Sequence, residues 1–320
     1  MNISDTILSE YQVRKSNKEK TRFIDYIKNR LVESDYDKEE DIVIEENGKG
    51  ILKSRNIVIG NLETAEVVLT AHYDTCALLP FPNLITPTNP VLFIGYQVLL
   101  VVMILCTAGI PAFFLGLFFY DAWITLWSFE LFMILLLVQM LFGFRNKHTA
   151  NDNTSGVICI TKFLEELPRE LRSKVCVVYF DNEEKGLLGS SFFNKKHKKS
   201  VENKMLINVD CVGDGKEIVT MAKEDARNDE KYTLFIESLH SSAISFDGKY
   251  LCRKMKFMMF PSDQAHFKKG IGVCAVQKSP IGRYVARIHT PLDNRCRKEN
   301  VEYLVSAMVD FVEKIEKDIH

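Results

Sequence analysis

The chain has 320 residues, of which 47% are hydrophobic, so it is long enough and apolar enough to fold around a substantial core. Its 41 basic and 42 acidic residues leave a formal net charge of -1, which excludes a nucleic acid as a partner held by phosphate neutralisation. The eight cysteines show neither CxxC pairs nor framework spacing, and the polar start MNISDTILSEYQ lacks the apolar core of a secretory signal. Reduced thiols and a cytoplasmic start are therefore predicted.

The first 72 residues predict one helical segment and three strands. Residues 4–32 carry apolar residues at helical spacing, and residues 41–46 and 51–60 read as two strands around the turn NGKG. The run EVVLTAH, residues 66–72, is typical of a buried strand and ends at His72.

An apolar insert at residues 89–145 interrupts this pattern. Between Asp74 and Arg145 the only charged side chains are Asp121 and Glu130. Residues 91–119 and 123–144 each exceed the roughly 20 residues that cross a hydrocarbon layer of roughly 30 Å. We therefore predict a transmembrane helical hairpin that contacts lipid through residues 91–144. The alternative is a buried helical hairpin or a lid over a hydrophobic pocket.

Two crossings leave both flanks of the insert on one side of the membrane. The basic residues that follow the second span, in RNKH, predict that this side is cytoplasmic. Glu130 is costly in lipid unless it is protonated or paired, so we expect it to face the first helix or a second copy of the chain. The second case would make the protein a homo-oligomer through the hairpin.

Helices and strands alternate after the insert. Helices are predicted at residues 155–168, 187–197, 229–243 and 300–318, the last capped by Asn300, and strands at residues 174–181, 204–210, 217–222 and 272–277. This alternation predicts an α/β fold, a three-layer sandwich around a mixed, largely parallel sheet. The domain is then discontinuous, residues 1–88 and 146–320, with the hairpin inserted at 89–145.

Acidic and imidazole side chains follow three of the predicted strands, in AHYDT, DNEE and DCVGDG. In parallel sheets the carboxyl ends of the strands form the site, so these side chains are expected to meet. The candidate set is His72, Asp74, Asp152, Glu183, Glu184, Asp210 and His289. Each piece alone is more typical of a helix cap or a solvated loop. Together, two histidines and three acids suffice for two metal ions that share a carboxylate.

Six motifs occur in a telling order: AHYDT, NDNTSGV, DNEEKGLLGS, NVDCVG, SDQAHFKKGIG and IHTPLDN. In this order they closely resemble the M28 zinc peptidases, a family of aminopeptidases and related exopeptidases with two zinc ions on an α/β sandwich. The resemblance covers the chain from about residue 40 to the C-terminus, without the insert.

The resemblance implies a role for each candidate residue. Asp152 would bridge the two Zn²⁺ ions, and the remaining ligands would be His72 with Asp210 on one ion and Glu184 with His289 on the other. Glu183 would be the general base. Asp74 would orient His72 by accepting its other ring hydrogen, as metal-bound histidines usually require.

Two positions depart from the family pattern. Residues 262–264 read SDQ where SDH is common, and Ile288 stands where some members have an oxyanion-stabilising tyrosine. Tyr284, Arg283 or Arg287 are the alternatives for that second role, and the sequence does not choose among them.

The expected function is that of a membrane-associated, metal-dependent exopeptidase. The leading hypothesis is a di-zinc aminopeptidase that acts on peptides, especially short apolar ones. Other readings are a glutaminyl cyclase-like enzyme with one zinc, a carboxypeptidase or amidohydrolase on the same scaffold, and a non-enzymatic membrane interaction module. Because the metal only activates water, the substrate depends on a pocket that motifs do not describe.

Overall fold

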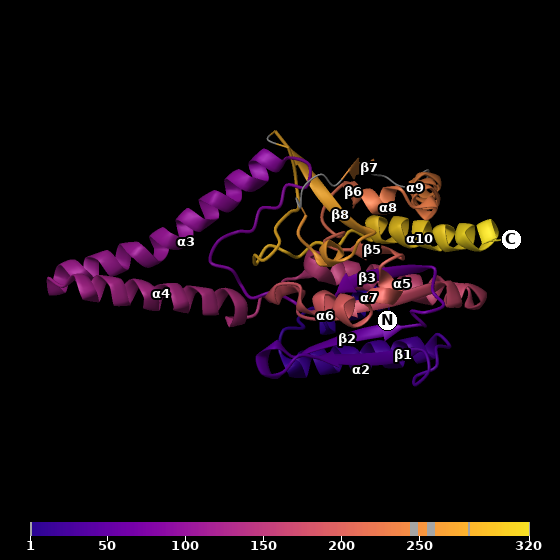
Figure 1. The fold of residues 1–320 in the computed structure, drawn as a ribbon, viewed down its shortest axis with the longest axis horizontal. Helices are drawn as coiled ribbons and strands as arrows, with labels where there is room; N and C mark the ends of the chain where they lie inside the picture. The colour runs from indigo at the N-terminus through magenta and orange to yellow at the C-terminus, as the bar shows by residue number, and fades with distance from the viewer. Residues whose placement is uncertain (1, 244–248, 255–259, 281, 320) are drawn as a thin grey trace.

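A mixed sheet forms the centre of the molecule (Figure 1). The computed structural model describes residues 2–243, 249–254, 260–280 and 282–319, and within them nine strands follow the order β1-β2-β4-β3-β5-β8-β6-β7, with β9 paired to β8. The strands are β1 (Ile42–Asn47), β2 (Ser54–Ile59), β3 (Val67–His72), β4 (Val175–Phe180), β5 (Met205–Val209), β6 (Glu217–Ala222), β7 (Lys249–Lys254), β8 (Gly270–Ser279) and β9 (Gly282–Tyr284).

The four central strands, β4, β3, β5 and β8, are parallel to one another, and β2 and β6 border them in antiparallel fashion. Fully apolar runs such as VCVVYF in β4 suit these central positions because helices cover both faces of the sheet. The predicted α/β fold with a mixed sheet is confirmed. The strands β7 and β9 were not predicted, since the first is rich in cationic residues and the second has three residues.

Helices cover both faces of the sheet. Their bounds are α1 (Ile3–Glu10), α2 (Asn17–Glu33), α3 (Pro90–Phe119), α4 (Ala122–Phe142), α5 (Gly156–Glu166), α6 (Leu188–Lys196), α7 (Lys198–Val201), α8 (Glu224–Arg227), α9 (Glu230–Ser242) and α10 (Lys298–Ile319). Successive side chains of β3 point to opposite faces of the sheet, so the core has two parts. Val67 and Leu69 pack toward α2, α5, α9 and α10, whereas Val68 packs toward α6 and α7.

Two details of the helices differ from expectation. The segment predicted as one helix over residues 4–32 is two helices, because Ser16 begins α2 with a capping box that includes Glu19. The predicted cap Asn300 is wrong, since α10 begins at Lys298. The Asn300 side chain is buried and donates hydrogen bonds to the carbonyl oxygens of Val212 and Gly215, at 2.8 and 3.0 Å.

The helices α3 and α4 project from the domain, meet at their far ends and diverge toward the sheet (Figure 1). Their most apolar windows have mean hydropathy of 2.7 and 2.0, and only 11% and 0% of those windows are buried. By length and composition both helices are able to cross a membrane, and the rest of the described chain does not bury them, as a buried hairpin would require. Glu130 is exposed, so it does not pack against α3.

Small residues let the two helices approach each other near the turn. Ala108, Ala112 and Gly116 are the buried residues of α3, spaced four apart along one face. A Cβ atom at Gly116 would lie 1.6 Å from the Thr125 hydroxyl oxygen, so only glycine fits there. The backbones of α3 and α4 therefore lie close together at this point.

The roots of the insert are paired beside the domain. Ala77 and Arg145 form an antiparallel bridge, and the Leu78 N–H donates to the Phe144 carbonyl oxygen at 2.7 Å. The Asn146 N–H donates to the Cys76 carbonyl oxygen at 3.3 Å. The chain thus leaves and re-enters the domain at neighbouring points, which lets the sheet form undisturbed.

Candidate metal centre

Three neighbouring parallel strands deliver polar side chains to one edge of the sheet. His72 is the last residue of β3, Glu183 and Glu184 lie on a one-turn 3₁₀ helix after β4, and Asp210 directly follows β5. Because β4 and β5 both pair with β3 in parallel, their carboxyl ends meet. The strand ends predicted to meet do so.

Asp152 and His289 join this edge from loops outside the sheet. Asp152 precedes α5, and its peptide bond to Asn153 is cis. The buried Asp293 carboxylate accepts the N–H groups of Asn151 and Asp152, at 2.7 and 3.0 Å. His289 lies only four residues before Asp293, so one short segment both supplies an imidazole and fixes the aspartate loop.

The Asp152 carboxylate stands between two pairs of side chains, each made of a histidine and an acid. Its Oδ1 lies 3.3 Å from His72 Nε2, which is 3.4 Å from Asp210 Oδ1. Its Oδ2 lies 2.9 Å from His289 Nε2, which is 3.2 Å from Glu184 Oε2. The arrangement is nearly symmetrical about one shared carboxylate.

Several polar atoms in this cluster are buried without a hydrogen-bond partner among the described residues, namely Glu184 Oε1, Asp210 Oδ1 and His289 Nδ1. A buried carboxylate oxygen without water or a hydrogen-bond partner raises the free energy of the folded chain. Carboxylate and imidazole donors are those that zinc accepts, so the residues fit divalent cations. Potential ligand atoms gather in groups within which all atoms lie within 4.8 Å of one another. One such group is formed by His72, Glu183 and Asp210, and another by Cys76, Glu184 and His289.

Asp74 supports both sides of the cluster. The His72 ring nitrogen Nδ1 lies 3.2 Å from the Asp74 carbonyl oxygen and 3.6 Å from its carboxylate. The two carboxylate oxygens accept the N–H groups of Glu183 at 2.9 Å and Glu184 at 3.3 Å. One buried side chain therefore orients an imidazole and anchors the turn that carries the paired glutamates.

Burial and close charges shift the protonation of the cluster. Burial lowers the pKa values of His72 and His289, but neighbouring carboxylates outweigh it and raise both well above the usual range. Burial raises the pKa of Glu183 well above its usual value. For Asp152 burial acts in the same sense, but hydrogen bonds and charge from the two histidines lower its pKa overall. Protonated imidazoles thus neutralise the carboxylates where cations would otherwise stand.

Two cationic side chains that the motifs did not include also support the site. Lys20 of α2 forms a buried ion pair with Asp181 and donates to Asn182 Oδ1 at 2.8 Å, just before the paired glutamates. Arg14 is fully buried and donates to the Thr154 hydroxyl at 3.1 Å. A signal for Lys20 exists in the sequence, since it shares one helical stripe with the buried Phe23.

The two departures from the motif pattern have structural roles of their own. Ser262 donates to Asp210 Oδ2 at 2.6 Å, and the buried Gln264 accepts a hydrogen bond from Asn208 at 2.9 Å. Ile288 is buried in the apolar core.

The candidates for the oxyanion role lie in varied surroundings. Arg283 and Arg287 form ion pairs with Glu217 and Asp214. Tyr284 lines an apolar pocket with Leu84 and Leu92 at the base of α3. Both arginines are thus already engaged by acids.

Comparisons with known proteins agree on family and fold. Residues 137–305, more than half of the chain, match the model of peptidase family M28. No curated protein matches the sequence. Among solved structures, the LapA aminopeptidase of Legionella pneumophila has a TM-score of 0.54 and 13% identity over 98% of this chain and 72% of that one.

Two further structures cover nearly all of both chains. A glutaminyl cyclase of Porphyromonas gingivalis has a TM-score of 0.59 and 13% identity over 98% of each chain. A Zn-dependent exopeptidase of Parabacteroides distasonis has a TM-score of 0.55 and 15% identity over 97% of this chain and 98% of that one. At these identities the likeness shows a shared fold, which is the fold expected from the motifs.

Proposed function

The chain belongs to peptidase family M28, and on that premise we propose that it is a di-zinc aminopeptidase that removes N-terminal residues from peptides. Family membership makes it a metallopeptidase-type hydrolase, and the proposal adds the number of ions and the substrate end. The observation that carries it is the Asp152 carboxylate, whose two oxygens each face a separate pair of histidine and acid.

Each ion would have ligands from both the sheet edge and the loops. We assign Asp152 as the bridging ligand, His72 and Asp210 to one ion, and Glu184 and His289 to the other. When bound, the ions would polarise the scissile carbonyl and lower the pKa of a water molecule. The unpartnered buried oxygens of Glu184 and Asp210 support this assignment, because ligation would satisfy both.

Glu183 is assigned as the general base. It lies with His72 and Asp210, and burial raises its pKa, which suits a group that takes a proton near neutral pH. Asp74 holds it in place by accepting its backbone N–H and orients His72 through the other ring nitrogen. We therefore assign Asp74 as a positioning residue rather than a ligand.

Substituting the two glutamates tests this division of roles. Glu183→Gln should lower turnover by roughly 10²- to 10⁴-fold with two ions still bound, since general-base catalysis contributes about that much. Glu184→Gln should instead lose one ion. Both variants would be assayed on a fluorogenic aminoacyl substrate alongside metal analysis. Full activity of Glu183→Gln would refute the assignment, and loss of turnover on blocking the substrate amine would establish the aminopeptidase polarity.

We further propose that the hairpin spans the membrane and that the catalytic domain, residues 1–88 and 146–320, lies on the cytoplasmic side. Cationic side chains gather at the root of α4, where Lys15 donates to the Leu141 carbonyl oxygen at 3.0 Å and Lys185 lies 5.7 Å from the Phe142 ring. This placement accords with positive charge at a cytoplasmic interface. Short apolar peptides are the proposed substrates, because the hairpin would hold the site near the bilayer surface.

Glutaminyl cyclisation is the second candidate, because the same fold carries that activity in the Porphyromonas gingivalis enzyme. One zinc per chain together with pyroglutamate formation from N-terminal glutamine would favour it. Two ions and release of free amino acids would favour the aminopeptidase. Activity on N-blocked peptides alone would point to a carboxypeptidase or amidohydrolase.

A further inference from the structure

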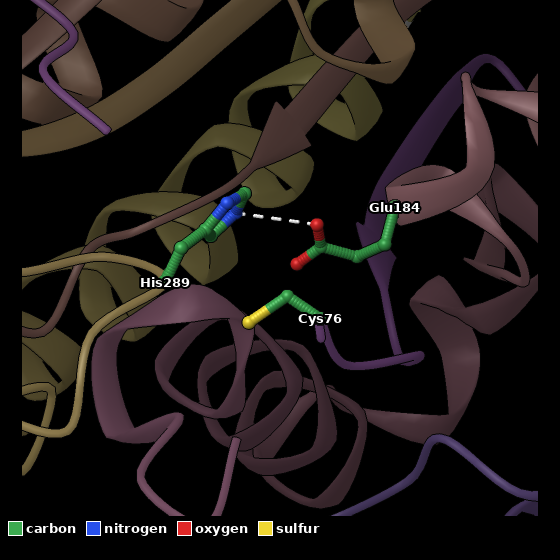
Figure 2. Close-up of side chains that lie close together, drawn as sticks. All are labelled: Cys76, Glu184 and His289. Carbon is green, nitrogen blue, oxygen red and sulfur yellow. Dashed lines mark ion pairs between the residues drawn. The ribbon is translucent and has the colours of Figure 1, made fainter. Parts of the chain in front are cut away.

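The Cys76 thiol lies beside the ion pair between His289 and Glu184, and none of the assigned roles includes it. Figure 2 shows the three side chains arriving from three separate segments, with the thiol just beneath the ion pair. Their ligand atoms all lie within 4.8 Å of one another. Cys76 is only 2% exposed, and it directly precedes the bridge that pairs the roots of the insert.

Two neighbours of this cluster indicate that it holds a ligand. The Glu184 side chain is 9% exposed, and its Oε1 has no hydrogen-bond partner within the described parts of the chain. The Asn146 side-chain amide donates to the Cys76 sulfur at 3.9 Å and to the Thr290 carbonyl oxygen at 3.0 Å. Asn146 therefore presents an N–H to the sulfur, as suits a sulfur that acts as an electron-pair donor, and ties it to the segment of His289.

A second thiol near the cluster has different surroundings. Cys211 lies with Asp152 and Asp210. Its side chain packs in an apolar cluster with Val219 and Met221. Cys76 belongs to none of the apolar clusters formed by the described residues, and its sulfur lies near Glu184, His289 and the Asn146 amide.

We propose that Cys76, as a thiolate, is a fourth protein ligand of the cation assigned to Asp152, Glu184 and His289. The inference rests on the proposed function, because it concerns the same metal centre. As the bond from sulfur to metal forms, the S–H bond breaks and its proton leaves to solvent. This ion would then have four protein donors, so that water or substrate would join it as a fifth ligand, whereas the ion at His72 and Asp210 would have fewer protein donors.

This difference in the number of protein donors would distinguish the two ions. Glu183 lies with His72 and Asp210, so the general base would stand beside the ion with fewer protein donors. The ion with four protein donors would hold together the loop of His289, the turn of Glu184 and the root of the insert at Cys76. A thiolate ligand would also bias that position toward zinc, cobalt or cadmium over manganese and magnesium.

Cobalt substitution of the full chain in detergent provides the test. Wild-type protein loaded with two Co²⁺ should show near-ultraviolet charge-transfer absorption from sulfur to cobalt, and its zinc form should show a Zn–S distance of about 2.3 Å by X-ray absorption. Cys76→Ser and Cys76→Ala should abolish both signals and weaken binding of one ion by about 100-fold or more, since losing an outer-shell partner alone costs roughly 10- to 100-fold. The second ion should bind as before.

The matched control is Cys176→Ala, a buried thiol in β4 that should leave both signals intact. Wild-type protein that binds two ions without a sulfur signal would overturn the inference and leave the di-metal proposal standing. Loss of the signal in Cys211→Ala, with retention in Cys76→Ala, would overturn it as well. A chain that binds no metal would overturn the proposed function itself. If both Cys76 variants fail to fold, the zinc spectra of the wild type and of Cys211→Ala decide, because a sulfur distance that is absent from the wild type, or lost with Cys211, overturns the inference.

Discussion

The metal centre and the hairpin depart in opposite ways from the usual burial of apolar side chains and exposure of charged ones. The centre buries ionisable groups, with His72, Asp152 and Asp210 each at most 5% exposed. The hairpin exposes apolar groups, with Val91 at 80% and Phe118 at 75%. The imidazoles pair with carboxylates of the centre, but buried atoms such as Glu184 Oε1 have no hydrogen-bond partner among the described residues, and most of α3 and α4 is uncovered. The partners proposed for the two regions are therefore cations for the one and a hydrocarbon layer for the other.

The two regions also differ in how far their residues are spread along the sequence. The hairpin is a local feature, complete within residues 90–142. The centre assembles residues from His72 to His289, and the hairpin lies between two of its members. The comparison therefore predicts that the centre still binds cations when the hairpin is removed from lipid, and that the hairpin still associates with the membrane when the cations are lost.

The largest effect is expected on removing the hairpin. Residues 90–142, which hold α3 and α4, would be replaced by a flexible Gly/Ser linker. The segment before α3 is kept, because Ile85 is buried and pairs with Val285. The shortened chain should move completely from the membrane fraction to the soluble fraction and still bind two zinc ions, since no assigned ligand lies in the hairpin. Fractionation by ultracentrifugation and metal analysis would check both. A shortened chain that still sediments with membranes would contradict the spanning hairpin.

The next effect concerns the shared carboxylate. Asp152→Asn should lose both ions, because its two oxygens serve both positions, whereas Asp210→Asn should lose only the ion shared with His72. Zinc content per folded chain measures the difference, and Glu302→Gln on the exposed face of α10 is the control. Equal loss in the two aspartate variants would argue against a bridging Asp152.

Much of this arrangement was predictable because its signals are short-range. Apolar runs defined the central strands, hydropathy defined α3 and α4, and the acids at strand ends identified the edge where His72 and Asp210 meet. The bounds of α5 and β4 were predicted to within two residues.

What escaped prediction depends on contacts distant in sequence. The cap at Asn300 looked local, but its side chain binds the carbonyl of Val212 across the fold. Lys20 and Arg14 lie outside the motifs. The helical stripe shared with Phe23 could have indicated that Lys20 is buried, but its ion pair with Asp181 and the contact of Arg14 with Thr154 need the folded chain. The clustering of Cys76 with His289 likewise needs the folded chain, since 213 residues separate them.

A pH effect of intermediate size should distinguish the two regions again. In the metal-free chain His72 and His289 have raised pKa values, so both imidazoles are protonated at neutral pH. Metal needs neutral imidazoles, so binding two ions should release about one proton from each and affinity should rise with pH. Calorimetry in buffers of different ionisation enthalpy measures this release. Binding without proton release would contradict the raised pKa values.

The same shifts set the stability of the metal-free chain. A raised histidine pKa contributes stability that is complete below the ordinary value of 6.5 and is lost as pH rises through the raised value. The lowered pKa values of Asp74 and Asp152 contribute above 3.8 and are lost as pH falls. These four groups should therefore contribute most between these limits, and bound zinc should remove the loss of the histidine contribution on the alkaline side.

The smallest effect is expected where the two regions join. The Glu19 carboxylate accepts the N–H groups of Ser16 at 2.8 Å and Lys15 at 3.2 Å, and it also forms an ion pair with Arg145 just after α4. Burial raises the pKa of Glu19, but the Ser16 hydrogen bonds and Arg145 outweigh it and lower the pKa. Its contribution to stability is therefore present above the ordinary value of 4.5 and is lost as pH falls.

A double-mutant cycle isolates the bond that joins the regions. Glu19→Gln and Arg145→Gln, singly and together, would be compared by urea unfolding of the full chain in detergent. The Arg145 side chain is 59% exposed, so the coupling should be only about 0.2–1 kcal/mol and should fall with added salt. Membrane association and zinc content should stay unchanged in all three variants. A coupling of several kcal/mol, or loss of zinc in the Arg145 variant, would show that the hairpin and the metal centre depend on each other, against the independence inferred from their separate partners.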